Sequence, residues 1–396
     1  MAPAGPTPRR LSGEAGAAAR WCARLADSLQ PPASPCRVLL LLAGTDTAAV
    51  PGISAAGATP ASRRGTAAAD AELLLLGPER PRPHALPPLP AGVSPALIAR
   101  VVVEQLGLEP LVADLGAPLA PAVPHLTLGQ GPARCLSSGA ALTPERVAQL
   151  LALGRRWGGA LARRGTPVLL AECVPGGTST AQAVLEGLGL PVAGLVSGSL
   201  REPAHGLKAE LVRRGLEASG LQPPAPPEAV LAALGDPMQA LAAGLVQAAA
   251  VQGLPLLLAG GSQMAAVQAL ALALTPAAAR PRLLEQAAIA TTAWVAAEPD
   301  SDLRALLGRI GQRWGGEPLA FAAGLRFHGC RSPELLAFEQ GYVKEGVGAG
   351  GLAVLWELSG RSPAALAAAC DQACDRLRPA IQRPAIQAPA PLEPPP

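Results

Sequence analysis

Aromatic side chains are scarce in this chain. Phe, Trp and Tyr together make up 2% of its 396 residues, and a single tyrosine is present. Proteins that bind single-stranded nucleic acid stack the bases on aromatic side chains and surround them with Lys and Arg. The net charge is only +3, with no long basic block. We therefore do not expect a nucleic-acid partner.

The cysteines lack a metal-binding or disulfide pattern. There are seven, an odd number, and no Cys-x-x-Cys occurs. Cys370 and Cys374 are spaced i,i+4, but no His or further Cys lies near them in the sequence to complete a zinc site. The sequence predicts reduced thiols, a cytoplasmic protein, no metal and no cofactor.

A secretory signal and a membrane span are also missing from the pattern. Charges at Arg9, Arg10 and Glu14 occupy the N-terminal segment, where a signal peptide would be apolar. Residues 237–279 carry no charge, but Pro, Gly, Ser and Gln interrupt them. An Ala-rich helix, a short strand and a second helix account for this stretch better than a membrane helix does.

What the sequence does contain is a regular alternation of strand-like and helix-like segments. Apolar residues are 49% of the chain, enough for a large core of Leu, Val and Ala. We expect strands at 37–43, 72–77, 111–114, 167–172, 192–199, 255–259 and 287–294. We expect helices at 21–29, 95–103, 143–164, 181–185, 300–313, 333–339 and 363–377. This order predicts an α/β protein with a doubly wound, mostly parallel, Rossmann-like sheet.

The ends of the chain and one internal segment have different compositions. Residues 1–20 show no sustained period and are expected to form a flexible leader. Residues 379–396 are rich in Pro and are expected to form a disordered tail. Residues 78–95 contain seven prolines and are expected to form a loop inside the main unit, 21–378.

Several predicted strands end in small or acidic residues. The strand at 167–172 ends in Glu172 and is followed by Gly176, Gly177 and Thr178 before a helix. A helix N-terminus after a glycine turn offers free N–H groups to an anion such as phosphate. The turn lacks the Gly-Lys-Ser/Thr of a Walker A loop, so a purely structural turn remains the alternative. The strand at 255–259 repeats the pattern with Gly260, Gly261 and Ser262.

A third glycine-rich segment lies near the C-terminus, at residues 341–351. Glu345 is an isolated carboxylate there, preceded by Lys344 and followed by Gly346 and Gly348. By spacing alone, Glu345 is either a solvated acid in the first turn of a helix or a group that faces a ligand. In a parallel sheet the carboxyl ends of the strands share one edge, so these polar turns are expected to converge on one crevice.

Three of these blocks, at 172–183, 258–266 and 344–350, resemble the nicotinate-nucleotide–dimethylbenzimidazole phosphoribosyltransferases of cobalamin biosynthesis. The blocks fall within residues 165–360. An incompletely characterised branch of that family also shares the segments 44–47, 52–60 and 341–346, so the resemblance spans most of the chain.

The resemblance implies an α/β domain, a smaller helical domain built from the chain ends, and a homodimer. The implied reaction transfers phosphoribose from nicotinate mononucleotide to a benzimidazole-type base, giving α-ribazole 5′-phosphate and nicotinate. Glu345 matches the catalytic base of the family, and Glu172 matches a second carboxylate of the family pattern. Residues expected at the phosphate and ribose are Gly176, Gly177, Thr178, Ser179, Thr180, Gly260, Gly261, Ser262 and Lys208. Residues expected at the base are Asp46, Gly346 and Gly348.

The chain departs from the family pattern in places that concern the acceptor. Lys344 replaces a glycine, and the family's N-terminal base-pocket segments are not recognisable. The same chemistry with adenine or another purine as acceptor therefore remains open. A non-catalytic protein that binds a nucleotide or a corrinoid intermediate is the other alternative.

Overall fold

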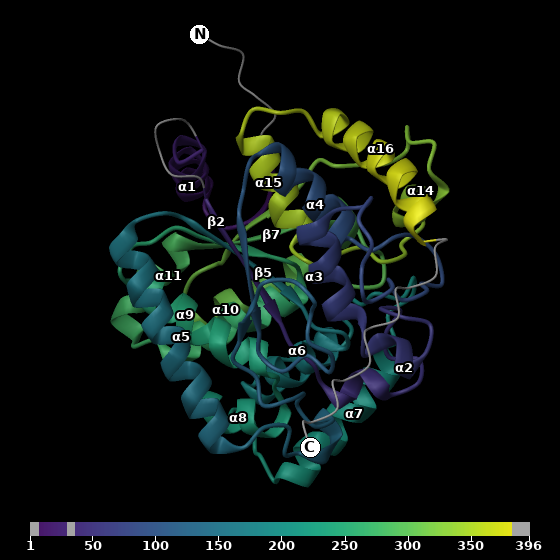
Figure 1. Ribbon diagram of the computed structural model, residues 1–396. Helices are drawn as coiled ribbons and strands as arrows, with labels where there is room; N and C mark the ends of the chain where they lie inside the picture. Colours follow the sequence, from purple (N-terminus) through teal and green to yellow (C-terminus); the bar gives the residue numbers. More distant parts are fainter. Residues whose placement is uncertain (1–7, 30–35, 382–396) are drawn as a thin grey trace, which may run out of the picture.

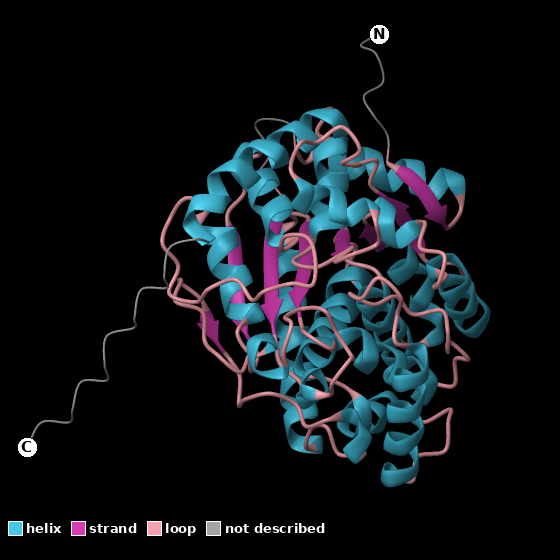
Figure 2. Ribbon diagram, turned by 90° about the vertical axis from the view of Figure 1, so that its right-hand side faces the viewer, coloured by secondary structure: helices cyan, strands magenta, loops and turns pink. Residues whose placement is uncertain are grey.

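The computed structural model describes residues 8–29 and 36–381. A single eight-stranded sheet passes through the molecule, with helices on both faces (Figures 1 and 2). The strand order is β1-β8-β7-β6-β5-β2-β3-β4. All neighbouring strands are parallel except β1, which is antiparallel to β8. The predicted α/β class with a mostly parallel sheet is confirmed.

The strands are short and most are apolar. They are β1 Arg9–Ser12, β2 Arg37–Leu42, β3 Pro110–Asp114, β4 Leu126–Thr127, β5 Val168–Cys173, β6 Leu256–Ala259, β7 Ala287–Thr291 and β8 Leu319–Ala322.

The helices lie mainly between successive strands. They are α1 Ala15–Asp27, α2 Pro60–Arg63, α3 Thr66–Leu76, α4 Ala96–Gln105, α5 Pro144–Arg164, α6 Gly177–Gly187, α7 His205–Ser219, α8 Pro227–Leu234, α9 Pro237–Val251, α10 Ser262–Leu274, α11 Arg280–Gln286, α12 Ala293–Ala296, α13 Leu303–Trp314, α14 Pro333–Glu339, α15 Ala349–Leu358 and α16 Pro363–Ile381. Short 3₁₀ turns cover Asp46–Ala49, Leu136–Ser138 and Ala277–Ala279.

Successive side chains of the central strands point to opposite faces, and each face has its own core. In β2, Leu39 and Leu41 pack into the cluster formed with α5, α9 and α10. Val38, Leu40 and Leu42 pack into the cluster formed with α3, α4 and α15. Both faces of the strand are apolar because both are covered, as is usual in parallel sheets.

The order of the strands reverses direction at β2. From β2 the chain continues outward through β3 to β4, and it then returns to β5 on the other side of β2. Open α/β sheets bind ligands at the carboxyl ends of the strands next to such a switch point. In this protein the switch lies between β2 and β5, and β5 ends in Glu172 and Cys173.

Two predicted strands are absent from the sheet. Residues 72–76 form the end of α3 and Gly77 caps it, because Leu favours a helix and the helix is buried along most of its length, from Thr66 to Leu74. Residues 192–199 form an irregular turn. In the sheet β5 has β6 on one side and β2 on the other, so no position beside β5 remains for residues 192–199.

The chain ends are more ordered than the sequence suggests. Residues 9–12, expected in a flexible leader, form β1, which pairs with β8. The helix expected at 21–29 begins at Ala15 instead, where the Glu14 carboxylate caps it through the N–H groups of Gly16 and Ala17. At the other end, α16 continues to Ile381. The rest of the predicted tail, 382–396, lies outside the described residues, as do residues 1–7.

The helices from the chain ends do not form a separate core. Trp21 of α1 and Cys370 of α16 belong to the same buried cluster as Leu40 of β2. A smaller, separate cluster comes instead from the middle of the chain, where Val212 of α7 and Leu234 of α8 pack together.

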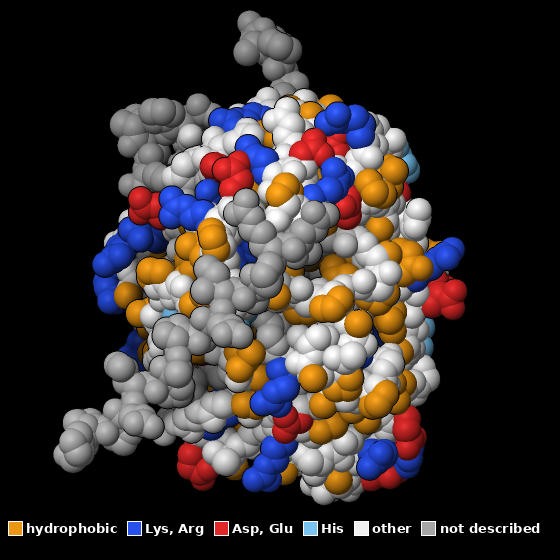
Figure 3. All heavy atoms as spheres, turned by 45° about the vertical axis from the view of Figure 1, so that its right-hand side comes forward, with side chains coloured by type: hydrophobic (Ala, Val, Ile, Leu, Met, Phe, Trp, Pro, Cys, Tyr) orange, Lys and Arg blue, Asp and Glu red, His pale blue; other side chains and the backbone are white. Residues whose placement is uncertain are grey.

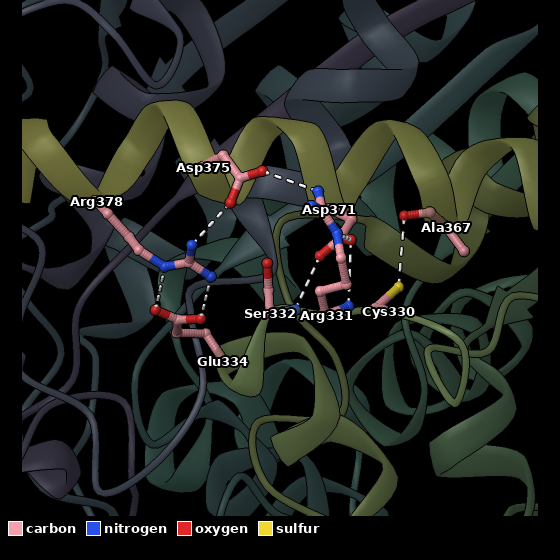
Figure 4. A network of polar contacts seen from close by, with 8 residues as sticks. All are labelled: Cys330, Arg331, Ser332, Glu334, Ala367, Asp371, Asp375 and Arg378. Carbon is pink, nitrogen blue, oxygen red and sulfur yellow. Dashed lines mark hydrogen bonds and ion pairs between the residues drawn. The ribbon is translucent and has the colours of Figure 1, made fainter.

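Polar contacts fix α16 against the loop that leads into α14 (Figure 4). Asp371 accepts hydrogen bonds from the backbone N–H of Ser332 at 2.9 Å and of Arg331 at 3.2 Å. Burial alone would raise the pKa of Asp371, but these donors lower it to about 2. Arg378 donates to both oxygens of Glu334 at 2.9 and 3.0 Å. The last helix therefore holds Glu334 in place.

The face shown in Figure 3 has no dominant sign of charge. Where grey atoms do not cover it, Lys and Arg side chains alternate with Asp and Glu, and apolar side chains occupy much of the area between them. Mixed charge of this kind is consistent with the small net charge of the chain.

Candidate functional site

A cavity of about 290 Å³ lies at the carboxyl edge of the sheet, beside the switch between β2 and β5. Segments far apart in the sequence line it. They are residues 54–56, Thr66 and Asp70, 86–89, 92–95, 172–178, 197–199, 261–263, Val295, Glu334 and 343–346. The predicted convergence of separate polar turns on one crevice is thus present for the turns after β5 and β6 and for the segment around Glu345.

Four donors hold the carboxylate of Glu345. Its Oε2 accepts from the Thr291 hydroxyl at 2.9 Å and from the Thr292 N–H at 3.0 Å. Its Oε1 accepts from the N–H groups of Gly350, at 3.0 Å, and Gly346, at 3.2 Å. Burial raises the pKa of Glu345, and these donors oppose the rise. The side chain is therefore fixed in orientation, and its ionised form is favoured by hydrogen bonding.

The backbone around Glu345 has an unusual conformation. Val343, Lys344 and Val347 have φ angles of 67°, 54° and 52°, which are uncommon for residues with a side chain. The N–H of Val347 donates to the carbonyl of Glu172 at 3.0 Å, so the segment is attached to the end of β5. Strained backbone conformations of this kind concentrate at functional sites and persist only where surrounding contacts enforce them.

Glycines allow the following helix to lie against the sheet. A Cβ on Gly348 would be 2.7 Å from the Cβ of Ala171, and one on Gly351 would be 2.3 Å from the Cβ of Ala259. A Cβ on Gly350 would be 2.5 Å from Oε2 of Glu345. Because these positions lack side chains, α15 approaches β5 and β6 closely enough for its first N–H groups to reach Glu345.

Lys344 points away from the cavity opening and into the protein. Its side chain and that of Glu298 are each 2% exposed, and the ammonium is hydrogen-bonded to the Glu298 carboxylate. The ammonium also donates to the carbonyl of Leu200 at 2.8 Å. Thr292 donates to the Lys344 carbonyl at 2.6 Å. Lys344 thus connects the Glu345 segment to the 197–201 turn and to the segment after α12.

Glu172 is a second buried carboxylate beside Glu345. It is 4% exposed, and its Oε2 accepts from the Val174 N–H at 3.0 Å. Burial raises the pKa of Glu172 to about 8, and the charges of Glu345 and Asp236 add to the rise. Burial and the neighbouring carboxylates therefore favour the protonated form of Glu172 near neutral pH.

Two helices begin at the cavity. Gly176 precedes α6 in the left-handed conformation, with φ of 79°, and Gly261 precedes α10. Neither helix has a side-chain cap at its N-terminus. The first N–H groups of an α-helix have no acceptor within the helix, so both ends can donate to an anion. Ser262 lies at this edge too, where its hydroxyl accepts from the Ser197 N–H at 3.0 Å.

Other residues expected at the site lie elsewhere. Thr180 is fully buried and donates to Asp236 at 2.6 Å, and Ser179 is also fully buried beside it in α6. Lys208 is fully buried too, with its ammonium 2.5 Å from the Ser197 carbonyl. Asp46 is exposed in a 3₁₀ turn outside the cavity lining.

Two of the predicted glycines also have structural positions. Gly260 has a φ of 154° and donates to the carbonyl of Ala290 at 2.8 Å. Gly348 packs against β5, as described above. The structure therefore brings Glu345, Glu172, Gly176, Gly177, Thr178, Gly261, Ser262 and Gly346 to the cavity.

Sequence patterns did not reveal one wall of the cavity. Asp70 of α3 and Ser94 line it, together with Leu86, Leu89 and Val93 of the proline-rich loop. Asp70 lies in a mostly apolar stretch of Ala and Leu that also contains Glu72, so the sequence gives no signal that sets Asp70 apart. The loop carried only a signal for irregular structure.

Two features are absent from residues 8–29 and 36–381. Within them no helix has the length and apolar character required to cross a membrane. No cluster of three or more His, Cys, Asp or Glu side chains suited to a metal ion is found in the same ranges. All seven cysteines, which fall within these ranges, are free.

Comparison with known proteins gives consistent matches. A family model described as Phosphoribosyltransferase matches residues 96–287. The UPF0284 protein SYNW1869 of Parasynechococcus marenigrum (strain WH8102) is 53% identical, over 86% of this chain and 87% of that protein. The UPF0284 protein glr4139 of Gloeobacter violaceus (strain ATCC 29082 / PCC 7421) is 47% identical, over 90% of this chain and 91% of that protein.

Solved structures share the fold. The nicotinate-nucleotide–dimethylbenzimidazole phosphoribosyltransferase of Thermus thermophilus superposes with a TM-score of 0.55 at 21% identity, covering 89% of this chain and 88% of that one. A second structure, of CobT from the same organism, gives a TM-score of 0.54 at 20% identity, with the same coverage of 89% and 88%. The resemblance seen in the sequence is thereby confirmed. The chain belongs to the UPF0284 proteins, and its residues 96–287 match the phosphoribosyltransferase family model.

Proposed function

We propose that this protein transfers phosphoribose from nicotinate mononucleotide to the ring nitrogen of an aromatic base, forming an α-ribazole 5′-phosphate or its analogue for cobalamin assembly. The observation that carries the proposal is the position of Glu345. An oriented carboxylate lies in one cavity with a second carboxylate and with two uncapped helix N-termini.

The reaction exchanges one C–N bond for another. The ring nitrogen of the base attacks C1′ of the ribose, and the bond from C1′ to the pyridinium nitrogen breaks with its electron pair going to nicotinate. The N–H proton of the base passes to Glu345 as the new bond forms. General-base assistance of this kind contributes about 10²–10⁴-fold to the rate.

Glu345 must release one of its present donors to accept that proton. An ionised carboxylate offers about four lone-pair sites, and four protein donors already engage this one. The longest contact is that from the Gly346 N–H, at 3.2 Å. In our proposal the incoming N–H replaces this donor, while Thr291, Thr292 and Gly350 keep the carboxylate oriented.

The remaining groups supply binding and electrostatics. The N-termini of α6 and α10 bind the 5′-phosphate through Thr178 and Ser262, while the Gly177 N–H already donates to the Val174 carbonyl at 2.8 Å. Positive charge develops on the ribose as nicotinate leaves, and the carboxylate of Glu345 lies in the same cavity to stabilise it. Glu172 in its protonated form donates a hydrogen bond to the substrate, which orients the ribose before attack.

The test is a turnover assay with purified protein, nicotinate mononucleotide and a panel of bases, with products identified by mass. We expect a base riboside phosphate and equimolar nicotinate. Glu345→Gln should lower the rate by at least about 10²-fold while nicotinate mononucleotide still binds. Normal turnover by Glu345→Gln would refute the role of this residue. Binding of the nucleotide without product over the whole panel would instead support a non-catalytic binding protein.

The resemblance also implies a homodimer, which we include in the proposal. Leu111, Leu119 and Leu126 are large apolar side chains that are 40–49% exposed at the β3–β4 end of the sheet. A second copy of the chain that covers this end would remove them from water. Sedimentation equilibrium of the wild type and of Leu126→Asp tests this, because a dimer that uses this surface should dissociate in the variant. A dimer unaffected by the substitution would place the interface elsewhere.

A further inference from the structure

The part of the cavity next to Glu345 is a largely apolar slot. Leu86, Leu89 and Val93 line it from the proline-rich loop. The loop also contacts the Glu345 segment directly, because a Cβ on Gly346 would be 3.1 Å from Pro95 and one on Gly92 would be 3.1 Å from Val343. Because Glu345 and these apolar residues line one cavity, a flat base with its ring nitrogen at Glu345 would lie against this wall.

Asp70 is a charged group in this apolar wall. It projects from α3, is 5% exposed and lines the cavity. Ser94 donates to its Oδ1 at 2.6 Å, and the thiol of Cys173 donates to its Oδ2 at 3.5 Å. Among the described residues no Lys, Arg or His forms an ion pair with Asp70.

The hydrogen-bonding capacity of Asp70 is therefore only partly used. A carboxylate has about four acceptor positions, and two are occupied, one of them by a weak thiol donor. Burial raises the pKa of Asp70 to about 6, so the group is mainly ionised near neutral pH. A buried carboxylate that faces only carbon is costly, whereas a donor from a ligand removes that cost.

We propose that Asp70 determines which acceptor base the site takes, by accepting a hydrogen bond from an amino or hydroxyl group on the far edge of the base. The proposal rests on the phosphoribosyl transfer proposed above and specifies its acceptor. A base whose far edge bears only methyl groups, such as 5,6-dimethylbenzimidazole, would leave Asp70 without that donor. A hydroxybenzimidazole or an aminopurine such as adenine supplies it.

The test compares four probes: adenine, 5-hydroxybenzimidazole, benzimidazole and 5,6-dimethylbenzimidazole. Turnover with nicotinate mononucleotide and binding by calorimetry are both measured for each. We expect the wild type to favour the donor-bearing bases by at least about 10²-fold in kcat/KM, because a site built around a hydrogen bond discriminates strongly against analogues that lack the donor. Asp70→Leu should lose this preference and favour 5,6-dimethylbenzimidazole. Ser94→Ala, which removes the partner of Asp70, should change the preference less.

Leu89→Ala is the matched control from the same wall. This substitution removes apolar contact, so it should weaken the binding of all four bases to a similar extent. The ratios of their kcat/KM values should stay unchanged. Equal losses for all bases in Asp70→Leu, or a wild type that prefers 5,6-dimethylbenzimidazole, would overturn the proposal.

The two measurements separate this inference from the proposed reaction. Donor-selective binding that Asp70→Leu abolishes, without turnover of any base, would support the role of Asp70 and reject the transferase reaction. Turnover without selectivity among the bases would support the transferase reaction and reject the role of Asp70. If no base binds and none is turned over, both are rejected.

Discussion

Lys344, the residue that precedes the proposed catalytic Glu345 in the chain, forms a buried ion pair with Glu298. Both side chains are 2% exposed, and Lys344 adopts a left-handed backbone conformation with φ of 54°. Through this pair Lys344 fixes the position of the segment that carries Glu345.

Removal of one partner of this pair should destabilise the protein strongly. Lys344→Met leaves the Glu298 carboxylate buried without its counter-charge, and such changes cost about 3–5 kcal/mol. Denaturant unfolding at pH 7 measures the loss. The double variant Lys344→Met with Glu298→Gln should be less destabilised than the sum of the single variants. Arg213→Ala, in an exposed network with Glu210 and Glu217, is the control and should change the stability far less, because exposed ion pairs contribute little.

The pH dependence of activity should respond to Thr291. Its hydroxyl donates to Glu345 at 2.9 Å and thereby lowers the pKa of that carboxyl. Thr291→Val removes the donor at nearly constant volume, so the pKa of Glu345 rises. Because the base acts when deprotonated, the acid limb of the kcat/KM profile should move to higher pH. Thr275→Val, at a buried threonine whose hydroxyl donates to the Ala271 carbonyl, should not move it. A limb unchanged in Thr291→Val would argue against Glu345 as the base.

The stability of the protein should depend on Glu172 as the pH rises. Burial raises the pKa of this carboxyl to about 8 in the folded protein, against a usual value of 4.5. Between these values the unfolded chain has lost the proton and the folded protein keeps it, so stability falls as the pH increases. Glu172→Gln removes this penalty.

The variant should therefore match the wild type near pH 4 and be the more stable of the two at pH 8. The slope of the difference is at most about 1.4 kcal/mol per pH unit. Glu357→Gln gives a comparison outside the cavity, because burial raises the pKa of Glu357 to about 7. A stability difference between Glu172→Gln and the wild type that is constant from pH 4 to 8 would contradict the assigned protonation.

Gly350 should tolerate no side chain. A Cβ there would be 2.2 Å from the backbone of Thr291 and 2.5 Å from the Glu345 carboxylate. Gly350→Ala should therefore displace Glu345 and lower the rate at least about 10-fold, by analogy with other small displacements of catalytic groups. Gly308→Ala, at a helical glycine with no neighbouring atom within 4 Å, should keep full activity and gain slightly in stability. Equal activities in the two variants would show that α15 can move away without affecting the site.

The sequence predicted those helices and strands whose start and end are marked by residues within or next to them. The helix α5 begins at Pro144 after the Thr143 cap, whose hydroxyl accepts from the Arg146 N–H. The strands β5, β6 and β7 were visible as short apolar runs followed by small polar residues. The polar ends of β5 and β6 also predicted that the turns after these strands line one cavity, because carboxyl ends of parallel strands meet at one edge.

The elements and residues that the sequence did not predict correctly depend on partners far away in the chain. The strand β1 exists because β8, which lies near the other end of the chain, offers it an edge. The segment 192–199 has strand-like composition but finds no free position in the sheet. Asp70 has the sequence signature of an ordinary polar residue, and only its packing against Ser94 and Cys173 places it in the cavity. Thr180 fits the polar pattern of the β5 turn, yet it points to Asp236 instead.

The antiparallel pairing of β1 with β8 has a practical consequence for anyone who shortens the chain. The four residues Arg9–Ser12 cover the open edge of β8, whose N–H and C=O groups would otherwise face water. Uncovered edges of this kind recruit strands from other molecules and promote aggregation. A version that starts at Gly13 should therefore precipitate more readily, even though every residue that lines the cavity is still present. Affinity tags placed at the N-terminus need a spacer long enough to leave this strand paired.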